Sequence, residues 1–243
     1  MSVVYLGLSS PLHPSHEWYK ARYVAKGLSQ IPGIDFDETF APVALYDSLL
    51  LLLTLSAHYD WKPVQLDVKS AFLYGELNET IYLELPEGYR QGDKVWKLQK
   101  CIYGLKQSPR EWYARLAASL AEKGFTPTHF DPCVFVKLKH NFYPSVYVNV
   151  IMIFGGAIPF QRYLITALKQ DFDCRDMGIE KYILGIEIKY TDTDIEIFQL
   201  GYLNKILGKF GMMDAKPIGT PLDNNNTIIK PQPDETMTDI TKY

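Results

Sequence analysis

The sequence has few cysteines, no long apolar run and no surplus of either charge. Cys101, Cys133 and Cys174 are odd in number and form no CxxC spacing, which excludes a small disulfide scaffold and indicates reduced thiols inside a cell, in cytoplasm or nucleus. The longest apolar run, Leu49–Ala57, is about half the length needed to cross a bilayer. The stretch Met1–Trp18 places no Lys or Arg ahead of its apolar residues, as a signal peptide would. We therefore expect no membrane association.

The charge balance excludes a protein that attracts nucleic acid through an overall positive charge. The 25 Lys and Arg residues oppose 28 Asp and Glu residues, so no overall basic field attracts nucleic acid. An enzyme that keeps positive charge in a cleft, with carboxylates on its floor, remains open. The chain of 243 residues is 47% hydrophobic and 22% charged, as expected of a globular protein with one large domain or two small ones. It contains no Walker motif, HExxH or GxSxG.

Apolar residues at helical spacing predict four helices. They cover Leu45–Tyr59, the stretch from Ser108 to Gly124, Pro159–Phe172 and Tyr202–Phe210. Asp47 or Ser48 is placed to cap the first helix. Ser108-Pro109-Arg110-Glu111 has the spacing of a capping box with proline at the first helical position, and Gly124 ends that helix.

Short β-rich runs alternate with these helices and predict an α+β fold. The strands cover Trp18–Lys26, Pro63–Val68, 81–89, 94–100, 133–138, 144–154 and Tyr182–Tyr190. A Pro-Glu-Gly turn lies between the third and the fourth, and a polar turn lies at Lys139–Asn141. Residues 1–16 are irregular, and 224–243 are a loose polar tail. Asn149 either marks a tight turn or lies on the wetter face of a continuous strand, and the apolar pattern favours the continuous strand.

Asp67 is the first candidate for chemistry. It lies between Leu66 and Val68 at the end of an apolar strand, where a buried carboxylate needs a partner or a cation. An aspartate that caps the following turn is the simpler interpretation, and position alone favours it. Phe72, five residues on, is by itself a core residue.

Basic residues form two groups that predict phosphate contacts only weakly, because charged runs are usually solvated. The first group contains Lys20, Arg22 and Lys26, and the second contains Lys94, Lys97, Lys100, Lys106 and Arg110. The acidic stretch Asp35–Glu38 is more typical of a solvated turn than of a metal site.

Taken together, several ordered segments resemble one known domain. They read YKARYVAKGLSQIPGIDFDETFAPVA, VQLDVKSAFLYGELNETIYLELPEGY, KVWKLQKCIYGLKQSPREWYARL, GFTPTHFDPCVFV, MGIEKYILGIEI and YLNKILGKFGMMDAKPIGTPLD. The chain thus resembles the reverse transcriptase domain of copia-type LTR retrotransposons over residues 17–223. The resemblance implies a right-hand polymerase with fingers, palm and part of a thumb, and it leaves residues 1–16 and the connection and ribonuclease H regions without a match.

The resemblance implies an RNA-directed DNA polymerase that binds an RNA template, a DNA primer and a deoxynucleoside triphosphate. Such enzymes use two Mg²⁺ ions, which require carboxylate oxygens. The family takes them from an aspartate in an LDVKSAF-type segment and from two aspartates in a YVDD turn. Carried over, Asp67 is a metal ligand, and the Val68 carbonyl completes the shell of the second ion.

The resemblance also assigns nucleotide-binding residues. Phe72 matches the aromatic residue that crowds the sugar 2′ position. Tyr103, Gly104 and the helix start at Ser108 form the platform under the incoming nucleotide and template. Lys20 and Arg22 are candidates for the triphosphate.

The YVDD turn is where this chain departs from the family. It reads Tyr147-Val148-Asn149-Val150, so both aspartates are absent. The departure predicts impaired Mg²⁺ binding and a catalytically dead copy from a decayed transposable element. We also expect Val150, which favours extended backbone, to disturb the turn. A module that binds RNA or RNA–DNA hybrid without chemistry, and a product without a selected role, both remain open.

Overall fold

The computed structural model describes residues 23–217 and 219, apart from 87, 91, 138–141, 156 and 192. The expectations for residues 1–16, for Lys20 and Arg22, for the turn at 139–141 and for the tail at 224–243 lie outside these residues. The chain divides into two units, and the boundary lies between Phe198 and Gln199. In the described part, no helix combines the length and the apolar character needed to span a membrane.

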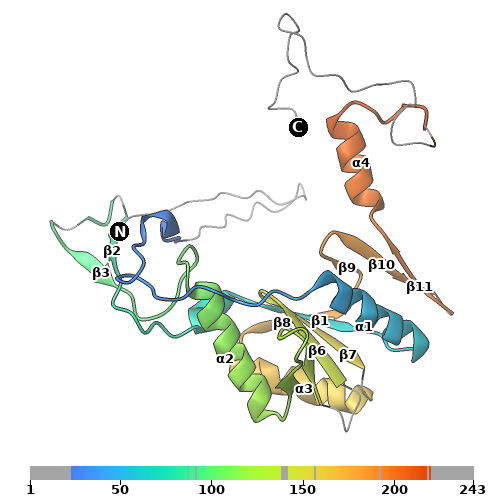
Figure 1. The fold of residues 1–243 in the computed structure, drawn as a ribbon, viewed down its shortest axis with the longest axis horizontal. Helices are drawn as coiled ribbons and strands as arrows, with labels where there is room; N and C mark the ends of the chain where they lie inside the picture. The colour runs from blue at the N-terminus through green and yellow to red at the C-terminus, as the bar shows by residue number, and fades with distance from the viewer. Residues whose placement is uncertain are drawn as a thin grey trace, which may run out of the picture. The chain divides into compact units, whose positions relative to one another are not determined.

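The centre of the first unit is a four-stranded antiparallel sheet (Figure 1). Its order is β6 (Phe142–Tyr147), β7 (Val150–Gly155), β1 (Val64–Val68) and β8 (Cys174–Ile179). Because β6 lies at an edge, it accommodates Pro144, which cannot donate a ladder hydrogen bond. The described elements mix helices with antiparallel strands, which confirms the predicted α+β class.

Alternate residues of β7 face opposite sides of the sheet, because side chains along a strand alternate. Ile151 and Ile153 are buried in one core with α2 (Ser108–Glu122) and α3 (Ile158–Asp171). Met152 and Phe154 are buried in a second core with α1 (Tyr46–His58) and the strands β9 (Tyr182–Ile183) and β10 (Ile186–Tyr190). The central strand is therefore covered on both faces, which explains its continuous apolar sequence.

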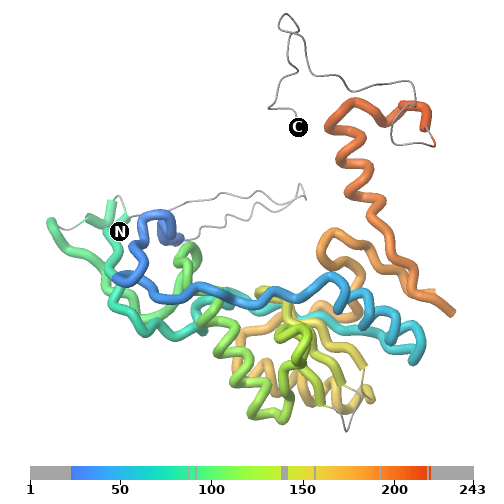
Figure 2. Tube along the Cα trace, viewed as in Figure 1, coloured from blue at the N-terminus to red at the C-terminus, as the bar shows by residue number. Residues whose placement is uncertain are grey.

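The remaining described elements are short. The set consists of the 3₁₀ turns Gly27–Ser29 and Ala71–Tyr74, the pair β2 (Tyr82–Glu84) and β3 (Val95–Lys97), the pair β4 (Thr126–Pro127) and β5 (Phe135–Val136), the sheet of β9 (Tyr182–Ile183), β10 (Ile186–Tyr190) and β11 (Ile195–Phe198), and, in the second unit, α4 (Leu200–Lys209). Figure 2 shows residues 37–45, directly ahead of α1, as an extended segment that passes the start of α2.

The four predicted helices are confirmed to within two residues at each end, but both predicted caps are wrong. Neither α1 nor α2 has a side-chain cap hydrogen bond. At the start of α1, the Leu45 N–H donates to the Asp131 carboxylate at 2.9 Å. The Ser108 hydroxyl donates instead to the Ile102 carbonyl at 2.6 Å. At α1 a carboxylate distant in sequence thus accepts a hydrogen bond from an N–H at the helix start, whereas at α2 the serine hydroxyl binds the preceding loop and caps no helix N–H.

The strands predicted at 81–89, 94–100 and 133–138 are present but shorter, as β2, β3 and β5, and three other strand predictions are wrong in part. Residues 23–26, the described end of the strand predicted at Trp18–Lys26, are not in a strand. The predicted strand 144–154 is a hairpin, so the tight turn at Asn149 is correct and the continuous strand is not. The strand predicted at Tyr182–Tyr190 is also a hairpin, β9 and β10, because Leu184 and Gly185 both have positive φ. A turn of two residues inside an apolar run leaves the alternation of apolar residues unbroken, so the sequence pattern does not reveal it.

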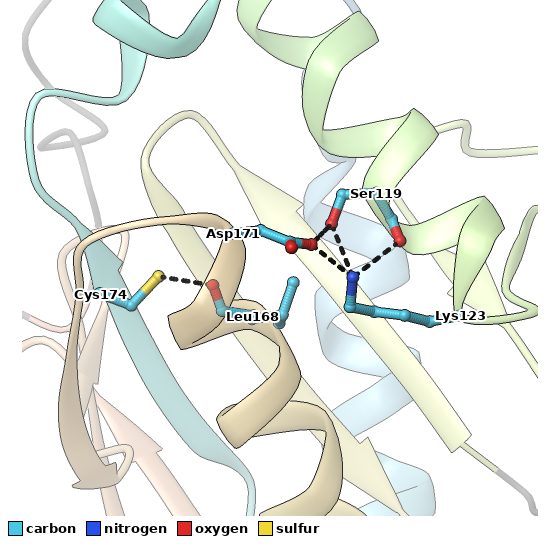
Figure 3. A network of polar contacts seen from close by, with 5 residues as sticks. All are labelled: Ser119, Lys123, Leu168, Asp171 and Cys174. Atoms are coloured by element: carbon cyan, nitrogen blue, oxygen red, sulfur yellow. Dashed lines mark hydrogen bonds and ion pairs between the residues drawn. The ribbon is translucent and has the colours of Figure 1, made fainter.

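A polar network joins the C-terminal end of α2 to the end of α3 (Figure 3). The Ser119 hydroxyl donates to the Asp171 carboxylate at 2.5 Å, and the Lys123 ammonium forms an ion pair with the same carboxylate. Burial alone raises the pKa of Asp171, but the hydrogen bonds from Lys123 and Ser119 outweigh it and leave that pKa below its ordinary value. This network fixes two helices that cover the same face of the sheet.

Candidate active site

The hairpin between β6 and β7 ends in a turn of two residues, Val148 and Asn149. Tyr147 and Val150 pair across it as the last residues of their strands. Val148 has φ of +54°, a left-handed conformation that is strained for a β-branched residue. Val150 belongs to β7, where the extended backbone that valine prefers is the one required. The expectation that Val150 disturbs the turn is therefore wrong, and the strain lies at Val148.

Asp67 lies beside this turn because β1 pairs with β7, with Asp67 opposite Val150. The Asn149 side-chain Nδ2 donates to the Asp67 Oδ1 at 2.6 Å. The Val68 backbone N–H donates to the Asn149 carbonyl at 2.8 Å. The turn after β1 has no side-chain cap, so the interpretation of Asp67 as a cap is wrong. The structure brings Asp67, Val68, Asn149 and Val150 together.

The donor set at this turn does not fit a pair of Mg²⁺ ions. Mg²⁺ requires oxygen ligands, and two ions held together require several carboxylates to offset their charge. Asp67 supplies a carboxylate, but the Asn149 amide turns its N–H toward it, and Val150 supplies no ligand atom. Among the described residues, no group of three or more His, Cys, Asp or Glu side chains is placed to hold a metal.

The predicted nucleotide platform lies next to the turn. The Phe72 and Tyr103 rings are in contact, with centroids 4.6 Å apart. Phe72 and Val148 both line a small cavity of about 50 Å³, which connects the platform to the turn. The Ser108 hydroxyl holds the loop before α2 through the Ile102 carbonyl. The structure thus gathers Phe72, Tyr103 and Ser108.

Gly104 completes the platform by allowing two chain segments to approach closely. Its φ is +93°, and a Cβ atom at this position would lie 2.0 Å from the Ala25 carbonyl oxygen. The Ala25 N–H donates to the Tyr103 carbonyl at 2.8 Å. Only glycine accommodates both the conformation and this approach.

A buried pair of amides fastens the same segment to the start of α2. Gln30 Nε2 donates to Gln107 Oε1 at 2.9 Å, and Gln107 Nε2 donates to the Asp35 carbonyl at 2.9 Å. The Lys106 N–H donates to Gln30 Oε1 at 2.7 Å. Sequence analysis missed this pair, since a lone glutamine carries no signal that it will be buried.

Two members of the second basic group make contacts within the protein. Arg110 forms ion pairs with Glu38 and Glu111, both at 3.1 Å. The Lys106 ammonium lies over the Phe36 ring, 4.8 Å from its centroid. These two members of the second group therefore serve contacts within the protein.

The three cysteines are free thiols. Burial raises the pKa of Cys101 and of Cys174 to about 11, and that of Cys133 to about 12. Each is therefore protonated near neutral pH, and none supplies a thiolate ligand to the site.

Comparison with known proteins decides the family. The profile described as reverse transcriptase (RNA-dependent DNA polymerase) matches residues 13–224. This chain belongs to the reverse transcriptase family. It is 41% identical over 224 residues to the Retrovirus-related Pol polyprotein from transposon TNT 1-94 of Nicotiana tabacum, covering 87% of this chain and 17% of that protein.

Two further relatives give the same result. The Retrovirus-related Pol polyprotein from transposon RE1 of Arabidopsis thaliana is 39% identical over 84% of this chain and 14% of its own length. The Transposon Ty1-DR5 Gag-Pol polyprotein of Saccharomyces cerevisiae is 30% identical over 81% of this chain and 12% of its own. The chain thus matches the reverse transcriptase domain of copia-type Pol polyproteins, spans less than a fifth of each relative's length, and confirms the resemblance seen in its motifs.

Sequence analysis of this reverse transcriptase domain assigned no role to Trp112, which lies within the helix predicted from Ser108 to Gly124. Trp112 is 2% exposed, and its indole Nε1 donates to the Val148 carbonyl at 2.6 Å. A signal was present, because a buried tryptophan needs a hydrogen-bond acceptor for its N–H.

Proposed function

We propose that this chain is a reverse transcriptase domain that keeps the nucleotide platform of its family but does not carry out nucleotidyl transfer. The proposal depends on one observation, the hydrogen bond from Asn149 Nδ2 to Asp67 Oδ1. In the family this turn carries two aspartates, whereas here a donor and an apolar side chain take their places. On the same proposal, residues 17–223 form fingers, palm and part of a thumb, and β1 with the β6–β7 hairpin is the palm.

The energetic argument concerns charge at the reacting phosphate. Each metal ligand lost removes several kcal/mol of transition-state stabilisation, and about 1.4 kcal/mol corresponds to a tenfold change in rate. Loss of two carboxylates therefore lowers the rate by many powers of ten. Asp67 by itself does not compensate, because its Oδ1 already accepts a hydrogen bond from Asn149.

Nucleic-acid binding is the second candidate function, and the intact platform favours it. The Phe72–Tyr103 ring contact and the fit of Gly104 against Ala25 do not involve the turn residues. Backbone phosphate contacts and stacking supply most affinity that is independent of sequence. The chain would then hold an RNA template paired with a DNA primer without extending the primer.

Primer extension on an RNA template, with Mg²⁺ or Mn²⁺, tests the loss of catalysis. The unchanged chain is compared with the double variant Asn149→Asp, Val150→Asp, and with that variant carrying Asp67→Asn as a matched control. We expect extension by the double variant alone. Extension by the unchanged chain at a comparable rate would overturn the proposal. Extension by none would place the fault elsewhere in the domain and remove the role given to the turn.

Fluorescence anisotropy with a labelled RNA–DNA hybrid tests binding separately. We expect binding at low salt that weakens steeply as salt is raised, and that weakens further in Phe72→Ala. Phe130→Ala, at an exposed phenylalanine outside the platform, is the matched control. Absence of binding at low salt, in a chain that unfolds cooperatively, would reject this second function.

A further inference from the structure

The turn at Val148 and Asn149 is strained, and the described contacts show what holds it. A β-branched residue at φ of +54° is unfavourable and persists only where its surroundings impose it. Val148 is 44% exposed, so side-chain packing does not impose this conformation. The backbone carbonyl of Val148, in contrast, accepts a hydrogen bond of 2.6 Å from the Trp112 indole.

Trp112 is well placed to hold the turn because it cannot move easily itself. It lies in α2 and is 2% exposed. Its ring contacts the Phe172 ring edge-on at 5.2 Å and lies 6.1 Å from the Tyr74 ring, measured between centroids. A side chain fixed on several sides presents its N–H in one position.

The turn positions the Asn149 carbonyl and side chain against β1. The Asn149 carbonyl accepts from the Val68 N–H, and the Asn149 side chain donates to Asp67. Both contacts require the backbone direction that Val148 sets. A change at Val148 therefore reaches Asp67 without any side chain of the site being altered.

We infer that Trp112 is a positioning residue: its indole N–H holds the strained Val148 backbone and thereby fixes Asn149 against β1. This role does not depend on whether the chain polymerises or binds nucleic acid. An alternative is that Trp112 only fills the core and its N–H donates to the nearest carbonyl. The two interpretations make different predictions for substitution of Trp112. Only if Trp112 positions the turn does the effect of that substitution depend on the strain at residue 148.

Amide hydrogen exchange at Val68 gives a local readout, because its N–H donates to the Asn149 carbonyl. Trp112→Phe keeps an aromatic ring and removes the N–H. We expect Val68 protection to fall about tenfold or more, while amides in the strand interiors change less. In a Val148→Gly background, where positive φ costs little, the same substitution is expected to lower Val68 protection by no more than about threefold.

Other outcomes would overturn the inference. An equal fall in both backgrounds, or a uniform fall across the sheet, would show that Trp112 only stabilises the core. Unchanged Val68 protection would show that the indole does not hold the turn. Trp96→Phe is the matched control, in the β2–β3 pair, and is expected to leave Val68 protection unchanged.

A second measurement applies if Trp112→Phe does not fold. The indole N–H of Trp112 is identified in the unchanged chain by elimination, with Phe variants of the other three tryptophans. We expect it to exchange with solvent more slowly than the others. Exchange as fast as that of an exposed tryptophan would contradict the hydrogen bond on which the inference depends.

Discussion

The two parts of the site are built differently. The platform of Phe72, Tyr103 and Gly104 depends on ring contact and on a close backbone approach to Ala25. The turn at Asn149 depends on side-chain chemistry, because the carboxylates expected there by family resemblance are replaced by an amide and a valine. The backbone of the turn is held by the ladder of the hairpin, in which Tyr147 pairs with Val150.

This difference shows which features survive a change of sequence. Strand pairing tolerates Asn149 and Val150, since neither residue alters the ladder between β6 and β7. On the function proposed above, metal chemistry does not tolerate them, since it depends on the charge and number of oxygen ligands. The proposed function therefore separates the fold and the platform, which do not depend on these two residues, from the chemistry, which does.

The largest expected effect is on the platform. Gly104→Ala would place a Cβ atom 2.0 Å from the Ala25 carbonyl oxygen at φ of +93°, so backbone must shift. We expect it to lower the free energy of unfolding by about 3 kcal/mol or more, measured by urea denaturation. Gly33→Ala is the control, with φ of +76° but open space around it, and should cost about 1 kcal/mol. Equal losses would show that the close approach is not what demands glycine.

An intermediate effect is expected where α2 and α3 meet, away from the platform and the turn. Lys123→Met removes the ion pair with Asp171 and should lower the free energy of unfolding by about 1–2 kcal/mol near neutral pH. The pKa of Asp171 is lower in the fold than in the unfolded chain, so its contribution is complete above the ordinary value of 3.8 and is lost as pH falls through the lower folded value.

Urea denaturation of both proteins between pH 7 and about pH 3 checks this sign. The difference between the unchanged chain and Lys123→Met should narrow as the pH falls. A difference that stays constant or widens on acidification would mean that the ion pair is not what lowers the pKa of Asp171.

The smallest effect is expected at the turn itself. Asn149→Ala removes the hydrogen bond to Asp67 and should cost about 1 kcal/mol of unfolding free energy. Asn149→Asp should cost more in the absence of divalent cations, because two carboxylates then face each other. A smaller loss for Asn149→Asp than for Asn149→Ala, measured with a chelator present, would contradict the contact as described.

The sequence predicted the helices well because their apolar faces repeat over several turns. It did not predict β8, whose residues Cys174–Ile179 are mostly exposed and include Gly178 at positive φ. Such an edge strand is held by its backbone pairing with β1 and leaves no alternating pattern. The hairpin at Val148 also lacked a sequence signal, since valine rarely adopts positive φ and does not indicate a tight turn.

The candidate site was predictable only through family resemblance. Asp67 alone favoured a turn cap, and the contact with Asn149 joins residues 82 positions apart. Phe72 and Tyr103 likewise come together only in the fold. Tertiary pairs of this kind have no local signature, so the motifs carried the prediction and the structure supplied the geometry.

Binding of Mn²⁺, followed by electron paramagnetic resonance, tests the central claim most directly. The unchanged chain and the variant Asn149→Asp, Val150→Asp are titrated in the presence of a hybrid with a terminated primer and a matching nucleotide. Mn²⁺ held by the nucleotide alone is subtracted with a sample that lacks protein. The account predicts that the restored variant holds a pair of ions at the site and the unchanged chain does not. Equal binding of a pair of ions by both would contradict it, because the two lost carboxylates would then not be what separates this chain from its relatives.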